Sequence, residues 1–136
     1  MLEVVIDTNV LVSGIGWSGS PQMIIDAWKS DKIIVKATES IIEEYQIIAS
    51  LFSKKYKNTE FESTLNDLLL KIYLCKPAKL TKSISRDPDD DKFIACALNT
   101  KSKIIISGDA DLLDIPANNN FFVMKPRDFC DTYLSK

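Results

Sequence analysis

Short apolar runs alternate with amphipathic segments along the chain. The apolar runs have the length of buried strands, and they lie at residues 2–6, 33–36, 73–76, 103–107 and 121–125. The amphipathic segments repeat apolar residues every three or four positions, and they lie at 21–29, 38–53, 59–72, 88–99 and 126–134, with one helical turn at 109–113. Strands that alternate with helices are typical of a parallel sheet with helices on both faces. The pattern predicts an α/β fold, and 136 residues suit one domain spanning 1–136.

Two of the predicted helices form a hairpin. Thr38 is the expected cap of the first helix, and the polar segment 54–58 joins it to the second. This segment holds a basic patch that either attracts a partner or is only a solvated turn: Lys54, Lys55 and Lys57. Another irregular stretch, SGIGWSGS at 13–20, is expected to be a flexible loop, and Ser20 is the expected cap of the helix that follows.

Acidic residues occur where predicted strands end. Asp7 directly follows the first strand, and Asp109 follows the strand at 103–107. In an open parallel sheet, ligands bind beyond the carboxyl ends of the strands. If the two strands are neighbours, the two carboxylates converge. A further acidic group begins the helix at 88–99, and it consists of Asp87, Asp89, Asp90 and Asp91.

Charge and composition narrow the chemistry that such a cluster can perform. Two carboxylates about 4 Å apart repel by roughly 4 kcal/mol at an effective dielectric constant of about 20, so a bound cation would stabilise them. The chain has no histidine, which excludes Ser-His-Asp catalysis and imidazole metal sites. With 19 acidic and 17 basic residues, it lacks the basic excess of a protein that binds nucleic acid by bulk charge. Mg²⁺ or Mn²⁺ held by oxygen ligands would attract a polyanion without that excess.

Most of these acidic positions also have a plainer explanation. Asp87 before a proline is a good helix cap, and acidic residues in a first turn favour the helix dipole. Asp109 would cap the turn at 109–113. Glu43 and Glu44 lie on the helix at 38–53, where paired charges usually face solvent, although Glu44 borders the apolar stripe. Asp7 precedes no predicted helix, so capping leaves it unexplained.

The remaining composition points to an ordinary intracellular protein. The three cysteines are odd in number and widely spaced, which indicates neither a disulfide framework nor a zinc site: Cys75, Cys96 and Cys130. The N-terminus lacks the basic segment of a signal peptide, and no apolar run approaches the ~20 residues of a membrane span. A cytoplasmic location without a membrane segment is expected.

Four motifs, taken in order, resemble those of the PIN-domain family. They are VVIDTNVLVSG at 4–14, IIEEY at 41–45, RDPDDDKFIACAL at 86–98 and KIIISGDADLL at 103–113. Their order and spacing match the family over nearly the whole chain. The resemblance implies a three-layer fold whose central parallel sheet has the strand order 3-2-1-4-5, which sets Asp7 beside Asp109. Similar proteins are described as toxin components of bacterial toxin–antitoxin pairs.

The resemblance also implies a set of site residues. PIN domains are typically Mg²⁺- or Mn²⁺-dependent ribonucleases in which acidic residues bind one or two ions. The residues of this chain at the matching positions are Asp7, Glu44, Asp90 and Asp109. Glu43 competes with Glu44 for its position, and Asp91 competes with Asp90. The positions expected to support these ligands are Asn9, Ser107, Asp87, Asp91 and Asp111.

The expected activity is hydrolysis of RNA phosphodiester bonds by metal-activated water, which leaves a 5′-phosphate on the product. Lys54, Lys55 and Lys57 would guide RNA toward the site. Trp17 either stacks on a base or is a packing aromatic. The family resemblance further implies a homodimer and a cognate antitoxin, with the helical hairpin as the surface for either partner.

Two other classes of function stay open. A non-catalytic PIN domain would bind RNA or protein without cutting it, and loss of an acidic ligand would mark that case. A phosphoacceptor domain would use a strand-end carboxylate such as Asp7, but receiver-like domains usually carry paired acids early in the chain and a late lysine. Here the first strand ends in one acid, and Lys125 is the only lysine that fits.

Overall fold

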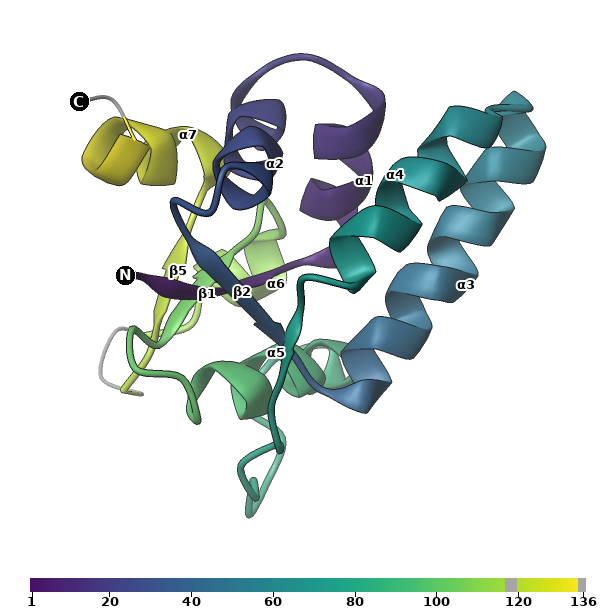
Figure 1. Cartoon of the computed structure of the whole chain (residues 1–136). Coiled ribbons are helices and arrows are strands. Elements are labelled where there is room, and N and C mark those ends of the chain that lie inside the picture. Colours follow the sequence, from purple (N-terminus) through teal and green to yellow (C-terminus); the bar gives the residue numbers. More distant parts are fainter. Residues whose placement is uncertain (117–119, 135–136) are drawn as a thin grey trace.

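The computed structural model describes residues 1–116 and 120–134, and it has a five-stranded parallel sheet at its centre (Figure 1). The strands are β1 (Glu3–Ile6), β2 (Ile34–Ala37), β3 (Tyr73–Leu74), β4 (Ile104–Ile106) and β5 (Phe122–Met124). Their order is β3-β2-β1-β4-β5, and every pairing is parallel. The predicted α/β class and strand order are confirmed.

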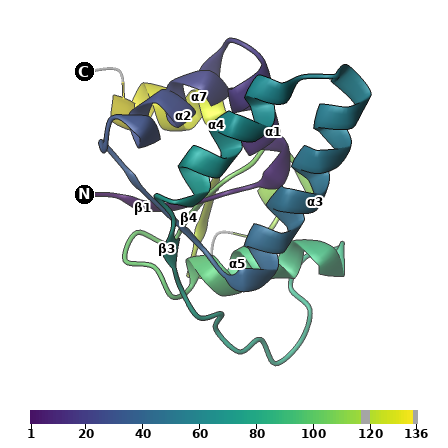
Figure 2. The ribbon, with the colours of Figure 1, turned by 45° about the vertical axis from the view of Figure 1, so that its right-hand side comes forward.

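Helices cover both faces of this sheet. They are α1 (Thr8–Gly16), α2 (Ser20–Lys29), α3 (Glu39–Tyr56), α4 (Thr59–Leu69), α5 (Asp91–Ala97), α6 (Ala110–Leu113) and α7 (Pro126–Phe129), with a 3₁₀ turn η1 (Pro88–Asp90) before α5 and a π turn η3 (Cys130–Leu134) after α7. Figures 1 and 2 show α1, α2 and α7 on one side of the sheet and α5 on the other, with the α3–α4 hairpin standing beside them. Within the described ranges, no helix is long and apolar enough to cross a membrane.

One predicted loop is a helix. The stretch expected to be a flexible loop from residue 13 onward is helical as far as Gly16, because α1 begins directly after β1. Gly14 explains the tight fit of this helix against α2: a Cβ at Gly14 would clash with Ile25 and lie 2.6 Å from the Pro21 carbonyl oxygen. The glycine that suggested a loop is therefore a point of close helix packing.

Helix boundaries elsewhere follow local capping chemistry. Thr38 caps α3 as predicted, since its Oγ1 accepts a hydrogen bond from the Ile41 N–H at 3.4 Å. Asn58 caps α4 in the same way through Phe61. The predicted cap Ser20 is wrong, because Gly19 occupies the cap position of α2 with a φ of 123°.

The strand register sets the position of the site. Ile6 at the end of β1 pairs with Ile106 at the end of β4, and both strands are fully buried. The Asp7 N–H donates to the Ile106 carbonyl at 3.0 Å, which extends the pairing by one residue. Residues that follow β1 and β4 therefore emerge side by side at one edge of the sheet.

Candidate metal centre

Ser107 joins the two acidic strand ends. Its hydroxyl donates to Asp7 Oδ2 at 2.6 Å and accepts the Asp109 N–H at 3.0 Å. Asp7 is only 6 % exposed, and Ser107 is fully buried. Burial raises the pKa of Asp7, the Ser107 hydrogen bond opposes that rise, and the nearby charge of Asp109 adds to it. The arrangement orients a carboxylate that is costly to ionise without a cation.

Asp7 and Asp109 each precede a helix, but their side chains make different hydrogen bonds there. Asp109 Oδ1 accepts the Asp111 N–H at 3.0 Å and so caps α6, as the plainer explanation of this residue required. A helix also begins directly after Asp7, which the sequence did not reveal. In the described chain the Asp7 side chain makes no fully formed capping hydrogen bond, although the backbone N–H groups of Thr8 and Asn9 lie close enough to lower its pKa. Capping accounts for one oxygen of Asp109, whereas the main hydrogen-bond partner of the Asp7 carboxylate is Ser107.

Asp90 is the acid whose surroundings fit a bound cation best. Its Oδ2 is buried and finds no hydrogen-bond donor among the described residues. Burial, a close contact with the Asp109 carboxyl, and the charges of Asp109, Asp87 and Asp7 raise the pKa of Asp90 to about 7. As a neutral acid Asp90 can donate to Asp109, whereas as a carboxylate it needs a cation. An orphaned oxygen among acids fits a hard divalent ion.

A second view of the same cluster comes from the oxygen positions. One carboxylate oxygen each from Asp87, Asp90 and Asp111 lie within 4.8 Å of one another. Oxygens on opposite sides of one Mg²⁺ are about 4 Å apart, so small side-chain movements would let these three share an ion. Arg86 holds Asp111 from outside, with Nη2 at 3.1 Å from Asp111 Oδ1 and 2.9 Å from Asp114 Oδ2.

Glu44 lies beside the cluster but is held by other partners. Its Oε2 accepts a hydrogen bond from the Thr8 hydroxyl, and its Oε1 accepts from Lys92 Nζ at 2.7 Å. The next residue, Tyr45, is fully buried and donates to the carbonyl of Ile6, which fixes this face of α3 against the end of β1. Glu43, the competing residue, is exposed to solvent.

Asp91 and Asp90, the two candidates for one ligand position, have different hydrogen-bond partners. The Asp91 carboxylate binds the segment before the 3₁₀ turn. It accepts hydrogen bonds from the Ser83 hydroxyl at 2.6 Å and from the N–H groups of Ile84 and Ser85 at 3.2 and 2.9 Å. Asp91 therefore fixes this segment, whereas the side chain of Asp90 points toward the other acids.

The other four expected supporting residues divide into two groups. Ser107, Asp87 and Asp111 lie in the cluster described above. Asn9 lies on the first turn of α1, two residues after Asp7, and is exposed.

Three residues in contact with the acids were missed from the sequence. Thr8 and Lys92 hold Glu44, and Arg86 holds Asp111. The only sequence signal was adjacency, since Thr8 follows Asp7 and the two basic residues flank the acidic run at 87–91. Their partners come from distant elements, so spacing alone did not reveal the pairs.

The proposed RNA contacts gather at the far end of α3. Trp17 is 51 % exposed and packs edge-on against Phe52 and Tyr56, with ring centroids 5.2 and 6.1 Å apart. Lys55 Nζ lies 5.4 Å from the centre of the Tyr56 ring. Trp17, Tyr56 and the exposed lysines Lys54, Lys55 and Lys57 form one surface, which we call the hairpin tip.

Comparison with known proteins gives two matches. A family model described as "PIN domain" matches residues 3–111, a range that contains all four acidic positions. An uncharacterized protein of Methanocaldococcus jannaschii is 28 % identical over 143 residues, which cover 97 % of this chain and 92 % of the relative. No solved structure matches the chain.

Proposed function

The chain belongs to the PIN-domain family, and from this membership and the acidic cluster we propose that it is a metal-dependent endoribonuclease. The observation that carries the proposal is the carboxyl of Asp90, which lies among Asp7, Asp87 and Asp109 and has one buried oxygen that receives no hydrogen bond from a described residue. A protein gains nothing in stability by converging carboxylates without a counter-charge. Retaining them is expected where a bound cation is needed for function.

The proposed ligands are Asp7, Glu44, Asp90 and Asp109, with Asp87 and Asp111 close enough to take part. One or two Mg²⁺ or Mn²⁺ ions would neutralise these acids, bind the phosphodiester and lower the pKa of a water molecule. Ser107 orients Asp7 for this purpose, and Thr8 orients Glu44. Lys92 forms an ion pair with Glu44 in the absence of a metal, and a cation bound by Glu44 would take over this neutralising role.

The RNA path that we propose runs from the cluster toward the hairpin tip. Helices α1 and α3 both lead from the site to this tip, since α1 begins after Asp7 and α3 carries Glu44. Exposed aromatic rings stack on bases of single strands, and nearby lysines bind phosphates. Lys54, Lys55 and Lys57 supply the charge there, and Trp17 and Tyr56 supply the rings.

We also propose that the protein is the toxin of a toxin–antitoxin pair and acts in the cytoplasm as a homodimer. The support is the exposed face of α3, where Ile47 and Leu51 are each 60 % exposed beside a shallow pocket. An apolar face of this kind suits a protein partner. Native mass spectrometry of the purified chain tests the dimer, and inspection of the adjacent reading frame tests the antitoxin.

A non-catalytic PIN domain is the second candidate, and one observation favours it. Two of the acids already have cationic partners, since Lys92 pairs with Glu44 and Arg86 pairs with Asp111. Such pairs would let the cluster persist without a metal. A phosphoacceptor domain is disfavoured, because receiver-type sheets have the order 2-1-3-4-5 and this sheet has 3-2-1-4-5.

Cleavage of a mixed RNA pool tests the proposal. Wild type, Asp7→Asn and Glu43→Gln are compared in Mn²⁺, in Mg²⁺ and in EDTA. We expect wild type and Glu43→Gln to cut RNA only with metal, and Asp7→Asn to be inactive although folded. Equal cutting by wild type and Asp7→Asn would refute the site. Metal binding without cutting of any RNA would favour the second candidate.

A further inference from the structure

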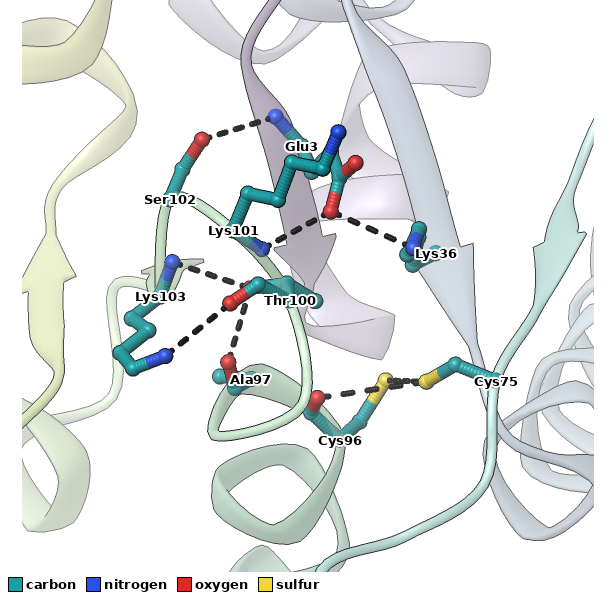
Figure 3. A network of polar contacts seen from close by, with 9 residues as sticks. All are labelled: Glu3, Lys36, Cys75, Cys96, Ala97, Thr100, Lys101, Ser102 and Lys103. Carbon is teal, nitrogen blue, oxygen red and sulfur yellow. Dashed lines mark hydrogen bonds and ion pairs between the residues drawn. The ribbon is translucent and has the colours of Figure 1, made fainter.

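Two cysteines that are 21 residues apart in the sequence meet on the side of the sheet that α5 covers. Cys75 follows β3 and Cys96 lies on α5, and their Sγ atoms are 3.0 Å apart (Figure 3). All three cysteines of the chain are free thiols in this structure. The wide spacing argued against a disulfide framework, but it did not reveal this contact. A disulfide bond needs an S–S distance of about 2.05 Å, so a movement of about 1 Å would form one.

The backbone holds both cysteines in place. The Cys75 N–H donates to the Ala37 carbonyl of β2 at 3.0 Å, so the sheet fixes this residue. Beyond it, the Ala78 N–H donates to the Ala95 carbonyl at 2.8 Å, and Asn99 Nδ2 donates to the Lys76 carbonyl at 2.7 Å. Hydrogen bonds thus join the segment after β3 to residues just before and just after Cys96. The contact between the sulfurs is a consequence of the fold.

The two thiols differ in access to solvent. Cys75 is half-buried and lines an open pocket of about 690 Å³ together with Thr38, Pro77 and Lys92. Cys96 is fully buried, and burial and the neighbouring sulfur raise its pKa. An oxidant that enters the pocket therefore meets Cys75 first, and Cys96 is placed behind it as the resolving thiol.

We propose that Cys75 and Cys96 form a reversible intrachain disulfide when the protein meets a hydroperoxide. The Cys75 thiol gives up its proton, and its sulfur attacks one peroxide oxygen while the O–O bond breaks. Cys75 becomes a sulfenic acid, and the leaving oxygen takes up the thiol proton and departs as water or an alcohol. Cys96 then attacks the Cys75 sulfur, the S–O bond breaks, and a second water leaves with the proton of the Cys96 thiol. The two thiols lose two electrons in total, and the peroxide gains them.

The disulfide would tie an exposed edge of the sheet to the helix of the candidate site. β3 has only two residues, and both are exposed. Lys92, which holds Glu44, lies one helical turn before Cys96 on α5. Cross-linking a loop of this length restricts the unfolded chain, so the oxidised protein is expected to melt several degrees higher than the reduced protein.

Thiol counting and peptide mapping test this proposal. The reduced protein is treated with hydrogen peroxide, alkylated, digested without reductant and analysed by mass spectrometry, and its melting temperature is measured in parallel. We expect one free thiol in place of three, a peptide pair linked through Cys75 and Cys96, and a higher melting temperature that dithiothreitol reverses.

Cys130→Ser is the matched control, because Cys130 is buried in η3, which packs against α2 rather than α5, and its thiol donates to the Ser20 carbonyl. This variant should form the same cross-link, and Cys75→Ser should not. Three thiols after oxidation, a cross-link through Cys130, a link between two chains, or arrest of Cys75 at a sulfinic acid would each overturn the proposal. If the cross-linked protein melts at the same temperature as the reduced protein, the disulfide does not stabilise the fold, and that part of the proposal is wrong. The test needs no RNA cleavage, so its outcome is independent of the proposed nuclease activity.

Discussion

The Ser107 hydroxyl hydrogen-bonds Asp7 Oδ2 at 2.6 Å across 100 residues of sequence. The hydroxyl oxygen of Ser107 in turn accepts the Asp109 N–H, so one buried hydroxyl positions the acids at the ends of β1 and β4. A parallel sheet brings the two strand ends together, and the serine then fixes how the side chains lie.

Replacing Ser107 with alanine should destabilise the protein in a pH-dependent way. The variant leaves the Asp7 carboxylate without its donor, which costs about 1.5–3 kcal/mol for a bond to a charged group. Because the Ser107 hydrogen bond favours the charged form of Asp7 and opposes the rise in pKa that burial causes, the loss should grow with pH as the ionised fraction of Asp7 increases. Urea unfolding at pH 8 and pH 4 measures the difference. Ser63→Ala, at an exposed position of α4, should change neither value.

Asp90 should make the metal-free protein less stable as the pH rises. Its pKa is raised from 3.8 to about 7 in the folded state, so the folded protein holds a proton that the unfolded chain has released. The stability contributed by this proton is full below about pH 4 and is lost as the pH rises through about 7. Melting temperatures in EDTA should therefore fall over this range in wild type.

Asp90→Asn should flatten this dependence and melt above wild type at pH 8, because it removes the charge that the other acids repel. Asp89→Asn, at the exposed neighbouring residue, should keep the wild-type slope. An identical pH profile for Asp90→Asn and wild type would show that Asp90 is not strained by its neighbours.

Gly14→Ala should destabilise the fold although alanine is the better helix former. The change gains about 1 kcal/mol of helix propensity, but overpacking a well-filled contact costs about 1–3 kcal/mol. The new methyl group would meet the Pro21 carbonyl and Ile25, and a backbone carbonyl cannot move aside easily. Gly108→Ala is the control, since nothing lies within 4 Å of its Cβ position. Thermal melting of both variants checks the prediction, and equal stability would contradict it.

The sequence predicted the sheet better than it predicted the helix that begins the site. Each strand appears as an apolar run, and alternation with helices gives the parallel arrangement. α1 was missed because two glycines and a serine interrupt its apolar residues, and the need for Gly14 arises only when α2 packs on it. Local pattern cannot show a close approach between two helices.

The convergence of the strand-end acids could be predicted from the sequence, whereas the side-chain partners of these acids could not. Asp7 and Asp109 stand at positions that any parallel sheet brings to one edge. The partners of Glu44 come from α1 and α5, and Cys75 meets Cys96 across the sheet surface. These contacts follow from packing angles and depths, which one sequence does not contain.

Mn²⁺ titration by calorimetry at pH 8 tests whether acids that are far apart in the sequence form one metal centre. We expect wild type, Glu43→Gln and Asp89→Asn to bind with equal affinity. Asp7→Asn, Glu44→Gln, Asp90→Asn and Asp109→Asn should each bind about tenfold or more weakly. Full Mn²⁺ affinity in folded Asp7→Asn and Asp90→Asn would contradict the account.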